Sequence, residues 1–97
     1  MALGAVDVAK EKGLLGKLVV FGNDGEIAAL ESIEAGELTG TQYTDVFQQG
    51  RLAASVATVL ATGGVTADAF ERQGHLLMPY VIVTRDYVTS VPADARW

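Results

Sequence analysis

The stretch Lys-Leu-Val-Val-Phe-Gly-Asn-Asp-Gly at residues 17–25 decides the fold. Its unbroken apolar run from Leu18 to Phe21 predicts a strand over 18–22 that is buried on both faces, as in a parallel sheet. The glycine, asparagine and aspartate that follow are turn residues, and a helical pattern begins directly after them. Open α/β sheets bind ligands at the carboxyl ends of their strands, so Asp24 is the first candidate site residue.

Helical and strand patterns alternate along the chain. In order, they cover residues 2–12 (helix), 18–22 (strand), 26–35 (helix), 39–44 (strand), 45–62 (helix) and 80–84 (strand). Helices that separate short strands predict right-handed crossovers. We therefore expect an α/β fold, a three-layer arrangement in which three parallel strands form a sheet with helices on both of its faces.

Several local signals mark where these elements begin and end. Asp45 followed by Gln48 fits a capping box, and Gly36 suits the left-handed backbone that follows a helix. Residues 65–73 are expected to form a short helix or turn, and the tail 87–97 to be irregular. The helix over 45–62 should bury one apolar stripe, made of Val46, Leu52, Val56, Val59 and Leu60.

Composition excludes several classes of protein. The chain has 97 residues, enough for one small domain, and its net charge of −5 without a basic stripe argues against nucleic-acid binding. No apolar run approaches the roughly 20 residues of a membrane span. The amino terminus lacks a signal-peptide pattern, so the chain as given is expected to be cytoplasmic. With no cysteine, one histidine and no nucleophile–base pair, we expect no metal, no cofactor and no catalysis.

Four phrases are informative in combination because they occur in a particular order. They are MALGAVDVAKEKG at 1–13, VVFGNDGEIAALESIEAGELTGT at 19–41, TDVFQQGRLAASVATVL at 44–60 and MPYVIVTRDYV at 78–88. Together they resemble the periplasmic sugar-binding proteins of ABC transporters, of the ribose-binding type. That family shares its fold with the effector domain of LacI-type repressors. The resemblance covers nearly the whole chain.

The resemblance implies that residues 1–97 are only part of a larger protein. A full member has two α/β lobes with a sugar bound between them, and this chain looks like the last part of the carboxyl-terminal lobe. It therefore looks like a truncation. The lobe has strand order 2-1-3-4-5, of which the chain would supply strands 3, 4 and 5. Strand 39–44 would then be central, and strand 18–22 would be an edge.

The resemblance also assigns roles to single residues. Asp24 matches an aspartate that accepts hydrogen bonds from sugar hydroxyls, which suits an acceptor-only carboxylate, although by its position it could equally cap the following helix. Thr44 falls where many members carry a sugar-contacting glutamine, and threonine is shorter. Asn23 is either a second ligand residue or one that tolerates the turn. We interpret Asp45 as a cap and His75 as a surface residue.

The implied function is that of a non-catalytic fragment of the solute-binding protein of a sugar ABC transporter. The intact protein would be periplasmic or extracellular and would bind a small sugar and the transporter permease. Half a cleft should capture sugar weakly or not at all. An effector-domain remnant of a LacI-type regulator and a self-associating α/β module without ligand are the alternatives. Because an exposed apolar edge recruits another chain, we expect a homo-oligomer formed through 18–22 or by exchange of helix 2–12.

Overall fold

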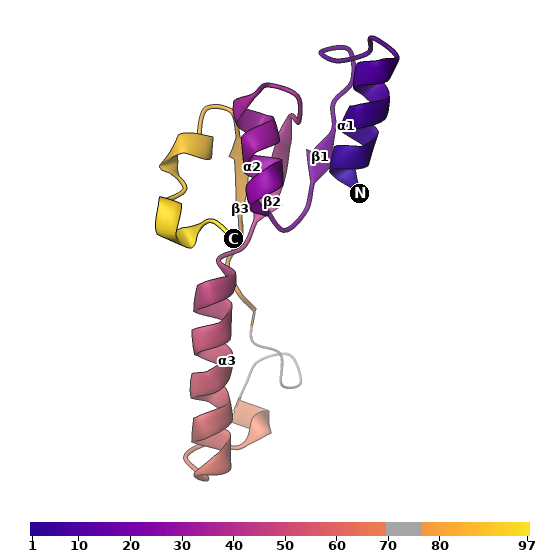
Figure 1. Ribbon diagram of the computed structural model, residues 1–97. Coiled ribbons are helices and arrows are strands. Elements are labelled where there is room, and N and C mark those ends of the chain that lie inside the picture. Colours follow the sequence, from indigo (N-terminus) through magenta and orange to yellow (C-terminus); the bar gives the residue numbers. More distant parts are fainter. Residues whose placement is uncertain (70–76) are drawn as a thin grey trace. The chain divides into compact units, whose positions relative to one another are not determined.

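The computed structural model describes residues 1–69 and 77–97, which form two compact units (Figure 1). The first unit comprises Met1–Thr44 and Tyr80–Trp97, and the second lies within Asp45–Pro79. The predictions for His75 and for residues 70–73 fall outside the described residues. The described elements are α1 (Ala2–Glu11), β1 (Phe21–Gly22), α2 (Ile27–Glu34), β2 (Gly40–Tyr43), α3 (Val46–Ala61), η1 (Ala67–Ala69), β3 (Val81–Thr84), η2 (Val88–Ser90) and η3 (Ala93–Ala95).

The first unit contains a three-stranded sheet in the order β1-β2-β3, which confirms an α/β fold with β2 in the centre. β1 runs parallel to β2, with Phe21 opposite Gly40. The prediction of an all-parallel sheet is wrong for β3, which runs antiparallel to β2 and places Val81 opposite Tyr43. The chain leaves β2 and re-enters the sheet at the same end, so residues 45–79 do not act as a crossover. Whether α3 covers a face of this sheet stays a prediction.

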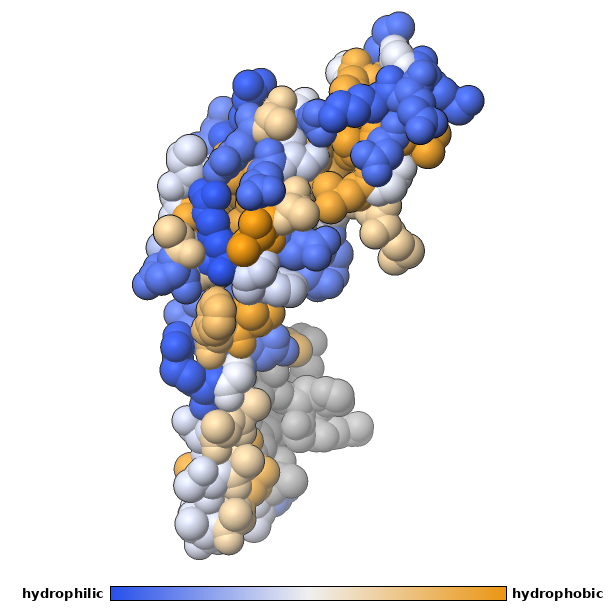
Figure 2. All heavy atoms as spheres, viewed as in Figure 1, coloured by the Kyte–Doolittle hydropathy of each residue, from blue (hydrophilic) through white to orange (hydrophobic). Residues whose placement is uncertain are grey.

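β1 is shorter and more exposed than its sequence predicts. Leu18, Val19 and Phe21 are 52%, 78% and 48% exposed, so burial on both faces is wrong for this chain. The predicted edge position is confirmed, because the described part of the chain supplies a neighbouring strand on one side only. The residue before β1 is nevertheless joined to the residue before β2, because the carbonyl of Val20 accepts a hydrogen bond from the amide of Thr39 at 3.0 Å. Figure 2 shows apolar side chains gathered near α1 and this edge.

The core of the first unit lies between α2, the sheet and the tail. α2 packs on β2 and on η2, and α1 packs against β1 (Figure 1). The helical spacing of α2 explains this, since Leu30 and Ile33 point to one side and are fully buried. The buried cluster consists of Val6, Ala29, Leu30, Ile33, Leu38, Tyr43, Val83, Val88 and Val91.

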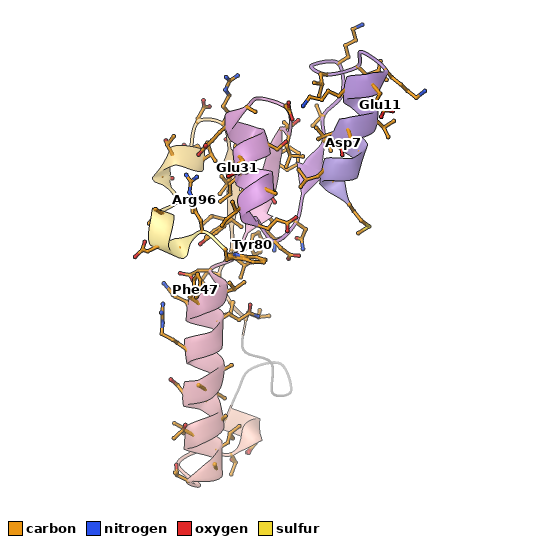
Figure 3. All side chains as sticks on the ribbon, viewed as in Figure 1. Asp7, Glu11, Glu31, Phe47, Tyr80 and Arg96 are labelled. Carbon is orange, nitrogen blue, oxygen red and sulfur yellow. The ribbon has the colours of Figure 1, made fainter. Side chains whose placement is uncertain are left out.

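The tail is more ordered than predicted, since it contains η2 and η3. Arg96 holds it in place (Figure 3): its guanidinium donates to the carbonyls of Val88 and Val91 at 3.0 and 3.3 Å and to Glu34 Oε1 at 2.9 Å. Tyr43 adds a hydrogen bond from its hydroxyl to the carbonyl of Ala95 at 2.7 Å. The tail therefore belongs to the folded body of the first unit.

The second unit is built on α3. The predicted cap is confirmed, because the Gln48 amide donates to Asp45 Oδ1 at 2.9 Å. The prediction of a buried stripe is wrong, since none of the residues of α3 is buried. Its apolar residues instead line a shallow groove of about 380 Å³ together with Met78. Helical periodicity reveals an apolar face, but it does not say whether the chain supplies a partner for that face.

Candidate ligand-binding site

Asp24 follows β1 directly and has an unusual backbone. Its φ is 83°, and among the described residues it is the one non-glycine residue with a positive φ. Such strained backbone is concentrated at functional sites, and aspartate tolerates it better than most residues. The alternative that Asp24 caps the following helix is wrong, because α2 has Glu26 as its N-cap residue, without a side-chain hydrogen bond. The turn continues through Gly25 before α2 begins, which moves Asp24 out of capping range.

Asn23 fixes the orientation of the Asp24 carboxylate. Its amide Nδ2 donates to Asp24 Oδ1 at 2.7 Å, and both residues are exposed. Within the described residues, Asp24 Oδ2 has no hydrogen-bond partner. An ionised carboxylate is acceptor-only, so this oxygen can accept from a ligand hydroxyl or amine.

Gly25 brings this corner directly against the end of β2. Its φ is 76°, and a Cβ built on it would lie 2.8 Å from Tyr43 Cδ2 and 3.0 Å from Tyr43 Cα. Next to this contact, the amide of Thr44 donates to the carbonyl of Asp24 at 3.4 Å. The ends of β1 and β2 therefore form one tight corner, which only a glycine at position 25 allows.

Replacing Gly25 by alanine should lower the free energy of unfolding by about 1–3 kcal/mol more than the same change at Gly16. Both glycines have a positive φ, 76° and 78°, so both variants suffer the same backbone strain. A Cβ at Gly16 meets nothing within 4 Å, whereas one at Gly25 meets the ring and backbone of Tyr43. Urea titration followed by tryptophan fluorescence measures the difference. Equal losses would show that the corner is not tightly packed.

A cavity of about 290 Å³ opens beside Asp24. Asn23, Asp24, Glu26 and Trp97 are the polar and aromatic residues among those that line it. The remaining lining residues are Met1, Ala2, Leu3, Gly22 and Ala29. A cavity that combines apolar walls with a few oriented polar groups is typical of small-ligand sites.

Two of the three predicted site residues line the cavity. These two are Asn23 and Asp24, whereas the half-buried Thr44 does not line the cavity. The backbone amide of Thr44 nevertheless donates a hydrogen bond to the carbonyl of Asp24. The sequence analysis did not select Glu26, and it left Trp97 in a tail that was expected to be irregular. No local signal could have found Trp97, because its contacts are to residues far away in the sequence.

Other sites within the described residues offer less chemistry. A groove of about 280 Å³ beside β3 is lined mainly by apolar residues and two tyrosines, without a carboxylate. The described residues contain no group of three or more His, Cys, Asp or Glu side chains that could hold a metal ion. None of the described helices is long and apolar enough to cross a bilayer. The Asp24 cavity is therefore the candidate site.

The sequence of residues 1–64 matches the family model described as periplasmic binding protein domain. The chain belongs to the periplasmic binding protein family. This confirms the resemblance inferred from the sequence. The family match contains the whole Asn23–Asp24 corner and ends before β3, so the tail with Trp97 lies outside it.

A curated relative of this periplasmic binding protein chain is the D-galactose/methyl-galactoside binding periplasmic protein MglB of Haemophilus influenzae. The two are 36% identical over 89 residues, which cover 89% of this chain and 26% of the relative. The chain thus spans about a quarter of the length of the curated relative that it matches.

Proposed function

We propose that the chain is part of the carboxyl-terminal lobe of a sugar-binding protein that serves an ABC transporter, and that the Asp24 corner contributes half of its sugar site. The observation that carries this proposal is the open acceptor of Asp24, held by Asn23 at the mouth of a cavity at the carboxyl end of β1. The printed name of the relative, a D-galactose/methyl-galactoside binding protein, supports a sugar as the ligand.

The chemistry of this corner fits a sugar hydroxyl. A hydroxyl donates one hydrogen bond, and a bond to a charged acceptor is stronger than one between neutral groups. Asp24 Oδ1 is already occupied by Asn23, so Oδ2 would take the ligand while the amide keeps the carboxylate oriented. Thr44 would lie at the edge of the ligand, joined to Asp24 through the backbone.

The intact protein would do more than this chain alone. A second lobe would close over the sugar and exclude water, and the closed form would dock on the transporter permease in the periplasm. The role is non-catalytic, because the corner holds acceptors but no nucleophile with an adjacent base. With half of the cleft, binding by the chain itself is expected to be weak, with a dissociation constant on the order of millimolar.

The test is a titration with D-galactose and methyl-galactoside, followed by NMR shifts of the backbone amides of residues 22–26. We expect saturable shifts there, and we expect replacement of Asp24 by asparagine to weaken binding about tenfold or more, because a charge-assisted bond is lost. Asp7→Asn is the matched control, since Asp7 is exposed on α1 and does not line the cavity (Figure 3). Equal loss in both variants, or no shifts in the parent chain, would contradict the proposal.

We also propose that the chain forms a homo-oligomer, in which β1 and the residues before it pair with a second copy. Leu18, Val19 and Phe21 expose apolar surface at an edge that has a strand neighbour on one side only within the described residues. Unprotected apolar edges of this kind pair with other chains. In the intact protein, the preceding strands of the lobe would cover the same edge.

A further inference from the structure

A chain of three hydrogen bonds joins the two ends of the turn between β1 and α2. The amide of Thr44 donates to the carbonyl of Asp24 at 3.4 Å. The indole Nε1–H of Trp97 donates to the carbonyl of Thr44 at 3.2 Å, and the carbonyl of Trp97 accepts from the amide of Ile27 at 2.6 Å. This hydrogen-bond chain, from Asp24 through Thr44 and Trp97 to Ile27, therefore fixes both ends of the turn that presents the Asp24 carboxylate.

The bond to Ile27 takes the place of a side-chain cap on α2. The first amides of a helix have no acceptor within the helix, and a side chain at the N-cap position commonly supplies one. Glu26 is the N-cap residue of α2, and it makes no side-chain cap hydrogen bond. The carbonyl of Trp97 serves the first amide of α2 instead. The start of this helix therefore depends on where the tail places Trp97.

Arg96 sets the place of the tail. Its Nη2 and Nε donate to the carbonyls of Val88 and Val91 at 3.0 and 3.3 Å, and its Nη1 pairs with Glu34 Oε1 at 2.9 Å. A guanidinium can make all three bonds because it carries five donors in a rigid plane, whereas the ammonium of lysine is a compact point charge. The side chain of Arg96 is 22% exposed, so the pair is partly shielded from water. These bonds fix the backbone directly before Trp97.

Arg96 acts on the turn from a distance. Trp97 is among the residues that line the Asp24 cavity, and Arg96 is not. Glu34 is the last residue of α2 and Ile27 is the first, so the tail is attached to both ends of this helix. An effect of Arg96 on a ligand therefore has to pass through the tail and the hydrogen-bond chain.

We propose that Arg96 is a positioning residue for the ligand site. By holding the tail, it keeps the carbonyl of Trp97 on Ile27 and thereby keeps the Asp24 carboxylate in place for a ligand hydroxyl. A turn that is free to move must be ordered when a ligand binds, which weakens the affinity. This inference rests on the proposed function and adds a residue outside the family match, since that match ends at residue 64.

Hydrogen exchange of the Ile27 amide tests the hydrogen-bond chain without any ligand. In Arg96→Ala we expect this amide to exchange at least about tenfold faster, because its acceptor is no longer held. The amides of the ladder between β2 and β3 should keep their parent rates. Arg85→Ala is the matched control, since Arg85 is an exposed arginine that also follows β3. Equal acceleration at Ile27 and in the ladder would show a general loss of stability and would overturn the positioning role.

Titration with D-galactose, followed by the amide shifts of residues 22–26, tests the effect on binding. We expect Arg96→Ala to bind about three- to tenfold more weakly and Arg85→Ala to bind within about twofold of the parent chain. Arg96→Lys keeps the charge beside Glu34 but not the planar donors that hold Val88 and Val91, so it should also bind about threefold more weakly. Parent-like binding by Arg96→Lys would show that charge alone matters, and the positioning role would be wrong.

The outcomes separate this inference from the proposed function. Sugar-induced shifts with the same affinity in the parent chain and in Arg96→Ala would overturn the positioning role and leave the sugar site intact. Absence of sugar-induced shifts in the parent chain would overturn both. If Arg96→Ala does not fold, the exchange rate of Ile27 and the affinity for D-galactose in Arg96→Lys decide the question.

Discussion

Replacing Ile33 by alanine is expected to lower the free energy of unfolding of the first unit by about 2–5 kcal/mol. Ile33 is fully buried in the cluster that also contains Leu30, Leu38 and Val83. Truncation removes apolar contacts and leaves a cavity that the surrounding side chains fill only in part. Because small domains are marginally stable, this loss is a large fraction of the total. Urea denaturation followed by the fluorescence of Trp97, which lies in the same unit, measures it.

The matched control is Ile27→Ala, the same chemical change on the same helix. Ile27 is 44% exposed, so its truncation should change the free energy of unfolding by less than about 1 kcal/mol. An Ile33→Ala chain that does not fold at all would agree with the expected loss. Equal unfolding midpoints for the two variants would contradict the packing of α2 on the core.

Replacing Val19 by lysine is expected to convert the chain from an oligomer to a monomer at micromolar concentration. Val19 is 78% exposed beside β1, where a second copy would pair. Lysine on an edge strand opposes such pairing, because its charge would have to be buried in the interface. Sedimentation velocity over a range of concentrations measures the change.

Val8→Lys serves as the control for the added charge. Val8 is an apolar residue of α1 that is 50% exposed, and it does not belong to the edge. We expect this variant to sediment like the parent chain. If the parent chain is already a monomer at every concentration, the proposal of self-association through β1 is wrong.

Local patterns predicted the three longer helices of this chain well. The apolar spacing of Leu30 and Ile33 and the left-handed Gly36 gave α2 to within one or two residues, and Asp45 gave the start of α3. These signals are short-range, since a helix face or a cap depends on residues three or four positions apart. The signal for Asp24 was also short-range, because the change from strand residues to turn residues placed it at the carboxyl end of β1.

The errors concern features that depend on residues far apart. The direction of β3 depends on where residues 45–79 return the chain, and their helical pattern does not contain that information. The exposure of Leu18 and the apolar face of α3 depend on partners that the described residues do not supply. Trp97 joins the site through Thr44, 53 positions earlier, so no periodicity could have revealed it.

Tyr43, where β2 ends, lies opposite Val81, where β3 begins. The intervening residues therefore behave as an insert whose two ends are fixed side by side by the strand ladder. The entropic cost of closing a loop, expressed as a free energy, rises by only about 0.6 kcal/mol for each doubling of the loop length. We therefore expect this insert to tolerate a change in length. Even its replacement by a tight hairpin turn should leave the register of β2 and β3 unchanged.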